Sequence, residues 1–158
     1  MSFTSRLTSA LVIAIIISIM PLPLVLLPFR PQLVLLLFLY LQFYAKAYFS
    51  VVLMLAVGIL LDVLHASTLG QHAFSMLFVC LIMSKRAMRF QFFTPIQSTL
   101  IILALCFLNN LIFAICGWIM GNPISWIYLA THALATVLCW PLVFFYMSNQ
   151  SSFFKGHI

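Results

Sequence analysis

Asp62 carries the only acidic side chain in this chain of 158 residues, and it lies in the stretch LLDVLHASTLGQH. A charged group among apolar residues is costly unless hydrogen bonds or an opposite charge compensate it. Ser67, Thr68 and the first N–H groups of the helix after the turn can donate such bonds, and the positive end of that helix's dipole favours an anion. His72 lies as far from the centre of the turn as Asp62 does. We therefore expect the carboxylate to be bound within this turn.

Two roles for Asp62 follow from this position. We favour a structural role, in which the carboxylate locks the turn that orients the third and fourth helices. Arg30 is a further candidate partner, and Gly70 is expected to let the chain enter the fourth helix closely packed. The alternative role is a direct contact with a partner or ligand.

The remaining residues do not indicate catalytic or cofactor chemistry. A nucleophile–base pair needs a group that orients its histidine, and only Asp62 could supply a carboxylate for this purpose. The four histidines lack the spacing of metal ligands, and the chain has no phosphate- or dinucleotide-binding fingerprint. We expect neither an enzyme nor a metal or cofactor site.

A second polar group is expected deep in the last third of the chain. Asn109 and Asn110 interrupt one apolar run and His132 interrupts the next, with the connecting loop centred near Gly121. Asn110 and His132 are equally far from this centre, so an antiparallel hairpin places them at the same depth. We expect them to approach within hydrogen-bonding reach, directly or through water, and to hold two helices together. A substrate or ion pocket is the alternative.

The composition indicates a membrane protein. Hydrophobic residues make up 66% of the chain and charged residues 5%, whereas a soluble domain needs roughly 25% charged residues. The net charge of +6 comes from basic residues that stand singly or in one small cluster between apolar runs. This arrangement is typical of membrane topology signals and argues against nucleic-acid binding.

The apolar runs predict a single all-α transmembrane domain with six helices. A helix needs about 20 apolar residues to cross the hydrocarbon core. Arg30-Pro31 and Asn122-Pro123 each place a proline where a new helix can start. We divide the region 31–64 into two helices near residues 46–50, because one helix of that length would span roughly 50 Å. The expected spans are approximately 7–28, 31–48, 48–64, 69–84, 95–119 and 124–147.

The basic residues predict the orientation of these spans. With both termini in the cytoplasm, six of the seven Lys and Arg residues fall on the cytoplasmic side, and only Arg30 falls outside. Lys85, Arg86 and Arg89 form a cluster that we expect to anchor the chain at anionic headgroups on the cytoplasmic face.

Three stretches resemble a known family. They are FRPQLVLLLFLYL (29–41), GILLDVLHASTLGQHAFSM (58–76) and CWPLVFFYM (139–147). All three are similar to the rod shape-determining protein MreD, and the similarity extends over essentially the whole chain. The middle stretch fits the family's pattern G-x-x-x-D-x-x-x-x-(S/T)-x-L-G. Ala66 stands where the family usually has glycine, which argues against a left-handed backbone at that position.

The resemblance implies a non-enzymatic scaffold in the bacterial inner membrane. Members of this family bind MreC and, with MreB, support the RodA glycosyltransferase and its class B penicillin-binding transpeptidase during sidewall peptidoglycan synthesis. The resemblance also implies a six-helix fold similar to the substrate-binding subunits of energy-coupling-factor transporters. A small-molecule-binding transporter subunit is therefore the alternative function. Such a subunit needs an outward pocket with convergent polar groups.

Overall fold

The computed structural model describes residues 3–20, 30–84, 93–121 and 126–148, and these residues form helices and turns without a strand. The all-helical character expected from the sequence is thus confirmed for this part of the chain. The helices are α1 (Phe3–Ile19), α2 (Leu33–Tyr44), α3 (Val51–Leu64), α4 (Gln71–Ser84), α5 (Pro95–Ile119), α6 (Trp126–Leu138) and α7 (Trp140–Ser148), with a 3₁₀ turn η2 (Lys46–Tyr48) between α2 and α3.

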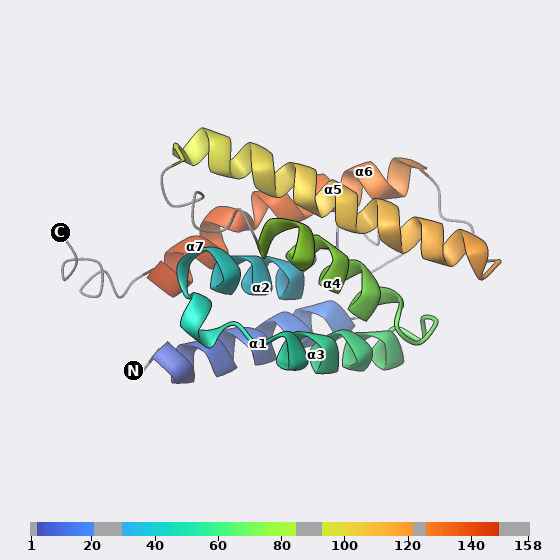
Figure 1. Ribbon diagram of the computed structural model, residues 1–158, viewed down its shortest axis with the longest axis horizontal. Coiled ribbons are helices and arrows are strands. Elements are labelled where there is room, and N and C mark those ends of the chain that lie inside the picture. The colour runs from blue at the N-terminus through green and yellow to red at the C-terminus, as the bar shows by residue number, and fades with distance from the viewer. Residues whose placement is uncertain (1–2, 21–29, 85–92, 122–125, 149–158) are drawn as a thin grey trace.

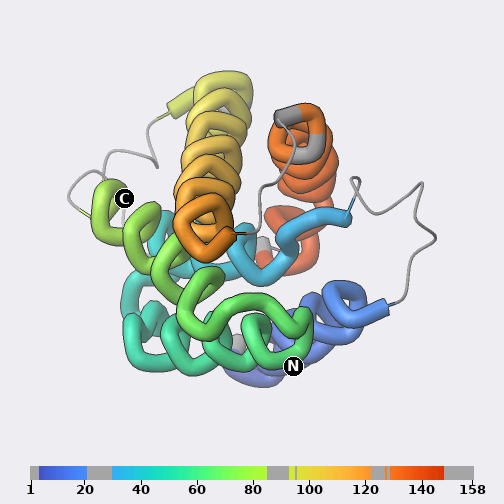
Figure 2. Tube along the Cα trace, turned by 90° about the vertical axis from the view of Figure 1, so that its right-hand side faces the viewer, coloured from blue at the N-terminus to red at the C-terminus, as the bar shows by residue number. Residues whose placement is uncertain are grey.

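Helix α2 is the centre of the bundle. Every residue from Val34 to Phe43 is buried, and the helix packs against α1, α4 and α7. Figure 1 and Figure 2 show α2 enclosed by the other helices. Its sequence explains this position, since a helix that is apolar on all sides is stable only when it is surrounded. Gln42, a polar exception, donates from Nε2 to the carbonyl oxygen of Cys80 at 2.6 Å and so ties α2 to α4.

The other helices lie on both sides of α2 and α4. Helices α5 and α6 pack together on one side, where α5 also contacts α4. Helices α1 and α3 lie on the opposite side, and α3 packs along α4 as an antiparallel hairpin (Figure 1). The turn of this hairpin, which we call the Asp62 turn (residues 62–72), is the segment that the sequence singled out.

Local residue chemistry sets where the helices begin and end. Helix α2 ends at Tyr44, and Ser50 caps α3 by accepting a hydrogen bond from the Leu53 N–H group, so the chain is divided between α2 and α3. Helix α5 begins at Pro95 behind a capping box, in which Thr94 and Gln97 bond each other's backbone N–H groups.

The expected last span, 124–147, is divided into α6 and α7 by a turn at Cys139. Pro141 explains the division, because proline has no N–H group and its ring collides with the carbonyl four residues earlier. The Cys139 N–H group bonds the carbonyl of Thr136 instead of continuing the α-helical pattern.

Two helical stretches among the described residues are long and apolar enough to cross a membrane, Ile96–Ile119 and Leu129–Met147. Four other apolar helices are shorter, with 10–17 residues each. A 14-residue helix is about 21 Å long, less than the roughly 30 Å hydrocarbon core. The crossing of the membrane by these shorter helices stays a prediction.

Candidate functional site

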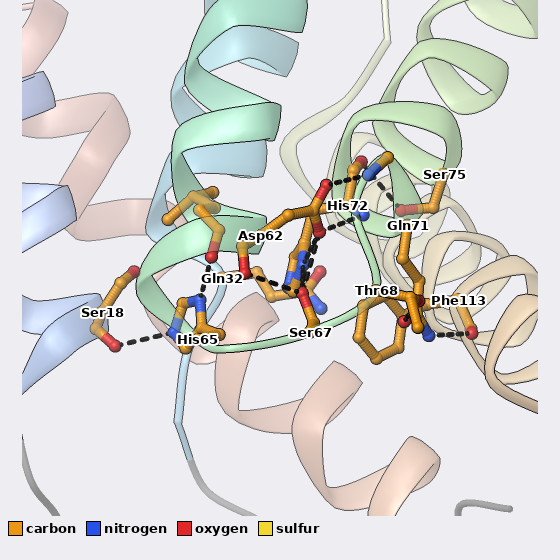
Figure 3. Close-up of polar contacts among 12 residues, drawn as sticks. Ser18, Gln32, Asp62, His65, Ser67, Thr68, Gln71, His72, Ser75 and Phe113 are labelled. Atoms are coloured by element: carbon orange, nitrogen blue, oxygen red, sulfur yellow. Dashed lines mark hydrogen bonds and ion pairs between the residues drawn. The ribbon is translucent and has the colours of Figure 1, made fainter. Parts of the chain in front are cut away.

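The carboxylate of Asp62 is completely buried and is bound by the turn that follows it. Its Oδ1 atom accepts hydrogen bonds from the Ser67 hydroxyl at 2.9 Å and from the His72 backbone N–H at 2.8 Å. Its Oδ2 atom accepts from the Gly70 N–H at 2.8 Å. Figure 3 shows the side chain directed at the start of α4. The first N–H groups of α4 have no acceptors within the helix, and the Asp62 carboxylate supplies these acceptors.

The imidazole of His72 adds a fourth contact. Its Nδ1 atom lies 2.8 Å from Asp62 Oδ1, and its ring packs 4.5 Å from the ring of Phe113 in α5 and 5.3 Å from that of His65. The ring of His65 faces the opposite way, with Nε2 at 2.9 Å from the Ser18 carbonyl and Nδ1 at 2.9 Å from the Leu61 carbonyl. The two stacked histidines therefore connect α1, α3, α4 and α5 (Figure 3).

The backbone of the Asp62 turn closes α3 with a Schellman motif. The Ser67 N–H bonds the Asp62 carbonyl at 3.0 Å, and the Ala66 N–H bonds the Val63 carbonyl at 3.3 Å. This motif requires a left-handed residue between them, and Ala66 has φ 49°. Alanine at this position argued against a left-handed backbone, and this expectation was wrong, because the hydrogen bonds around Ala66 outweigh the steric cost of one Cβ atom.

Thr68 and Arg30, two further candidate partners of Asp62, form hydrogen bonds with other residues. The Thr68 hydroxyl donates to Gln71 Oε1 at 2.7 Å, and Gln71 Nε2 donates to the Phe113 carbonyl at 2.8 Å, which fastens the turn to α5. Arg30 donates from Nη2 to the carbonyl of Met20, next to the end of α1. Within the part of the chain that the structure describes, Asp62 is paired with His72 and not with Arg30.

The asparagines of α5 belong to a chain of amides that starts before α2. Asn109 Nδ2 donates to Gln32 Oε1 at 2.9 Å, and Gln32 Nε2 donates to Asn110 Oδ1 at 2.7 Å. Asn110 Nδ2 then donates to the Leu129 carbonyl in α6 at 3.2 Å. The Gln32 backbone N–H also donates to the Thr136 hydroxyl at 3.1 Å. Gln32 thus links α2 to α5 and α6.

Gln32 was not among the residues selected from the sequence, although a glutamine directly after Pro31 and before an apolar helix was a usable signal.

His132 is buried, as Asn110 is, and it lies one turn beyond the carbonyl that Asn110 binds. A bond between the Asn110 and His132 side chains stays a prediction. Lys85, Arg86 and Arg89, the expected cytoplasmic anchor, lie outside the described residues.

A cavity of about 40 Å³ lies between the Asp62 turn and the amide chain. Its apolar wall comes mainly from α2, α3 and α4, and its polar wall from residues of several helices. The polar residues are Ser18, Arg30, Gln32, His72, Asn109 and His132. Ligand pockets for small molecules usually measure several hundred Å³. This cavity has the size of a water site.

Comparison with protein-family models gives a match over nearly the whole chain. The family model described as rod shape-determining protein MreD matches residues 2–150. Neither a curated protein nor a solved structure matches the chain.

Proposed function

The chain belongs to the MreD family of rod shape-determining proteins, and from this premise we propose that it is a non-enzymatic scaffold of the elongation machinery in the bacterial inner membrane. The scaffold binds MreC and, together with MreB, supports RodA and a class B penicillin-binding transpeptidase in sidewall peptidoglycan synthesis. Family membership supports the role in cell shape. The named partners and the non-enzymatic role are our proposal.

The state of Asp62 is the observation that carries the scaffold role. A carboxylate that performs acid–base or nucleophilic chemistry must reach its substrate. Asp62 is 0% exposed, and both of its oxygens are bound within the turn. The same bonds fix the positions of the residues between Ser67 and Gly70. The burial and bonding of Asp62 therefore support a structural role, in which the carboxylate holds the turn in one conformation, and argue against a catalytic role.

Leu69 is the residue that this rigid turn presents. It lies between two donors to Asp62, the Ser67 hydroxyl and the Gly70 N–H, and its side chain is 75% exposed. Its exposed side chain gains little from packing within the chain, yet it occupies the leucine position of the family pattern. We propose that Leu69 contacts MreC at the outer face of the membrane. Since the turn is held from within, little ordering entropy is lost when such a contact forms.

Capture of MreC tests this proposal. Leu69→Ala should reduce the amount of MreC that co-purifies in mild detergent, while the thermal midpoint of the purified protein stays unchanged. Leu138 in α6 is exposed to the same degree, at 76%, so Leu138→Ala is the matched control and should retain MreC. Equal MreC capture by both variants would remove Leu69 from the interface. Failure of the unmodified chain to restore rod shape in cells that lack MreD would overturn the scaffold role itself.

We further propose a multi-pass topology with six spans and both termini in the cytoplasm. The cluster of Lys85, Arg86 and Arg89 would then lie at the cytoplasmic headgroups, where each basic residue contributes roughly 1 kcal/mol of attraction to anionic lipid. This attraction fixes which loop stays inside the cell.

The alternative, a small-molecule-binding subunit of a transporter, has less support. It would use a pocket near the Asp62 turn, and the cavity there measures about 40 Å³. A vitamin-sized or drug-sized ligand needs a pocket of roughly 300 Å³ or more. Binding of such a ligand would require the helices around the cavity to move apart.

A further inference from the structure

The cavity beside the Asp62 turn is the point where residues of α1 to α6 meet. Ser18 comes from α1, Leu61 from α3, His72 from α4, Asn109 from α5 and His132 from α6, and the start of α2 completes the wall. A polar cavity between six helices influences how they all pack. Whether the polar atoms around this cavity have hydrogen-bond partners therefore affects the packing of all six helices.

The amide chain fixes which atom of Asn109 is left to bind something else. The carbonyl of Leu129 can only accept, so Asn110 must present its NH₂ group there and its oxygen to Gln32. Gln32 must then present its oxygen to Asn109, which donates with its own NH₂ group. The remaining atom, Asn109 Oδ1, is a buried acceptor, and it has no hydrogen-bond partner among the described residues.

Arg30 contributes the opposite kind of atom. Its Nη2 atom donates to the Met20 carbonyl, whereas its Nε–H group is buried and has no partner within the described part of the chain. An acceptor from Asn109 and a donor from Arg30 thus belong to two residues that line the same cavity. A buried donor or acceptor that has neither a protein partner nor water is destabilising, so each of these two atoms favours a bound water.

We propose that this cavity is an internal water site, in which ordered water accepts from Arg30 Nε–H and donates to Asn109 Oδ1. The ligand must both accept and donate, which excludes a simple cation or a simple anion. The volume of about 40 Å³ exceeds the roughly 10–15 Å³ that a cavity needs to hold one water molecule. Buried waters normally form hydrogen bonds with two to four polar groups. The cavity wall contains enough polar residues to supply them.

The water site connects the only acidic residue to Arg30 without direct contact. Asp62 bonds His72, and His72 lines the cavity together with Arg30. Water between them completes a polar path from the carboxylate to the guanidinium group. Asp62 is then linked to Arg30 through hydrogen bonds of His72 and water, and not by a direct ion pair.

Transfer of magnetisation from water to side-chain amides tests the proposal. The full chain, labelled with ¹⁵N and reconstituted in lipid vesicles, should show transfer from water to the Asn109 amide. Asn110 is the internal control, because it is the next residue, is similarly buried (4% against 2%) and has both amide atoms bonded within the protein. We expect the signal from Asn109 to be several-fold stronger than that from Asn110.

Arg30→Leu should weaken the water signal at Asn109 in the same experiment, because it removes one of the two groups that hold the water. Two results would overturn the proposal. Absence of transfer to Asn109 in the unmodified chain would show a dry cavity. Equal transfer to Asn109 and Asn110 would show general penetration of solvent and not a discrete site. Both of these measurements use the unmodified chain, so they stand even if the variant fails to fold.

Discussion

Gly58 and Ala73 bring the backbones of α3 and α4 into contact, since a Cβ atom added to residue 58 would lie 2.6 Å from the Cα atom of Ala73. No rotamer change can relieve a collision with backbone, so the two helices would have to separate. The hydrogen bonds of the Asp62 turn lie at the end of this pair of helices. Their geometry therefore depends on the close approach at Gly58, one turn before Asp62.

Gly58→Ala should destabilise the protein. Alanine gains up to about 1 kcal/mol in helix propensity, but overpacking against a fixed backbone typically costs 1–3 kcal/mol, and here the contact is far too short to absorb. We expect a lower thermal midpoint in detergent and less folded protein in membranes. Ala56→Val, on the exposed face of the same helix, is the control and should change the midpoint little. An unchanged midpoint for Gly58→Ala would contradict the close helix contact.

Ala66 and Gly70 provide a pair of changes with opposite expected signs. Both residues have left-handed backbones, with φ of 49° and 91°. Ala66→Gly removes a steric cost of roughly 1–2 kcal/mol and adds chain entropy worth about 0.4–1 kcal/mol, so a net stabilisation of about 0.5–1 kcal/mol is expected.

Gly70→Ala should lose about 1–2 kcal/mol from backbone strain and regain about 0.4–1 kcal/mol from the lower entropy of the unfolded chain, so a net destabilisation of about 0.5–1 kcal/mol is expected. No atom lies within 4 Å of the added Cβ, so no steric collision adds to this loss. Thermal unfolding of the two variants beside the unmodified protein measures both effects. A rise in the midpoint for Gly70→Ala, or a fall for Ala66→Gly, would contradict the described turn.

The Asp62 turn could be predicted because its partners are close in sequence. Ser67, Gly70 and His72 follow the carboxylate within ten residues, and a turn between two antiparallel helices must bring them near it. The left-handed backbone of Ala66 was missed because it depends on the balance between one steric cost and several hydrogen bonds. Residue preference alone does not decide such a balance.

The amide chain was only partly predictable from sequence. The burial of Asn109 and Asn110 followed from their apolar surroundings, but their partner Gln32 is separated from Asn109 by 77 positions. Such a pairing depends on which helices are neighbours, and hydrophobic periodicity does not contain this information. The same limit explains Arg30, which was a further candidate partner of Asp62. It donates instead to the Met20 carbonyl, next to the end of α1.

Reporter fusions test the proposed topology. Fusions after Lys46, Arg89 and Lys155 should report the cytoplasm, and a fusion near Asn122 should report the periplasm, because the positive residues are retained inside. A periplasmic signal from a fusion between Arg86 and Arg89 would contradict the six-span topology.

Neutralising Lys85, Arg86 and Arg89 together should disturb topology or abundance. If it instead abolished partner capture alone, the cluster would be a protein contact and not a lipid anchor.

Asp62→Asn and Asp62→Leu separate a structural role from a direct functional one. Asparagine keeps one acceptor for Ser67 and His72, but its NH₂ group faces the Gly70 N–H, which loses its acceptor, so Asp62→Asn should destabilise the protein less than Asp62→Leu does. Leucine leaves these donors without a buried acceptor, at about 1–3 kcal/mol for each group that water cannot reach. Asp62→Leu should therefore lower the amount of folded protein, the thermal midpoint and the complementation of a shape defect together. If the leucine variant stayed abundant and thermally stable in membranes but failed to restore rod shape, Asp62 would contact a partner directly, and the structural role that its buried hydrogen bonds support would be wrong.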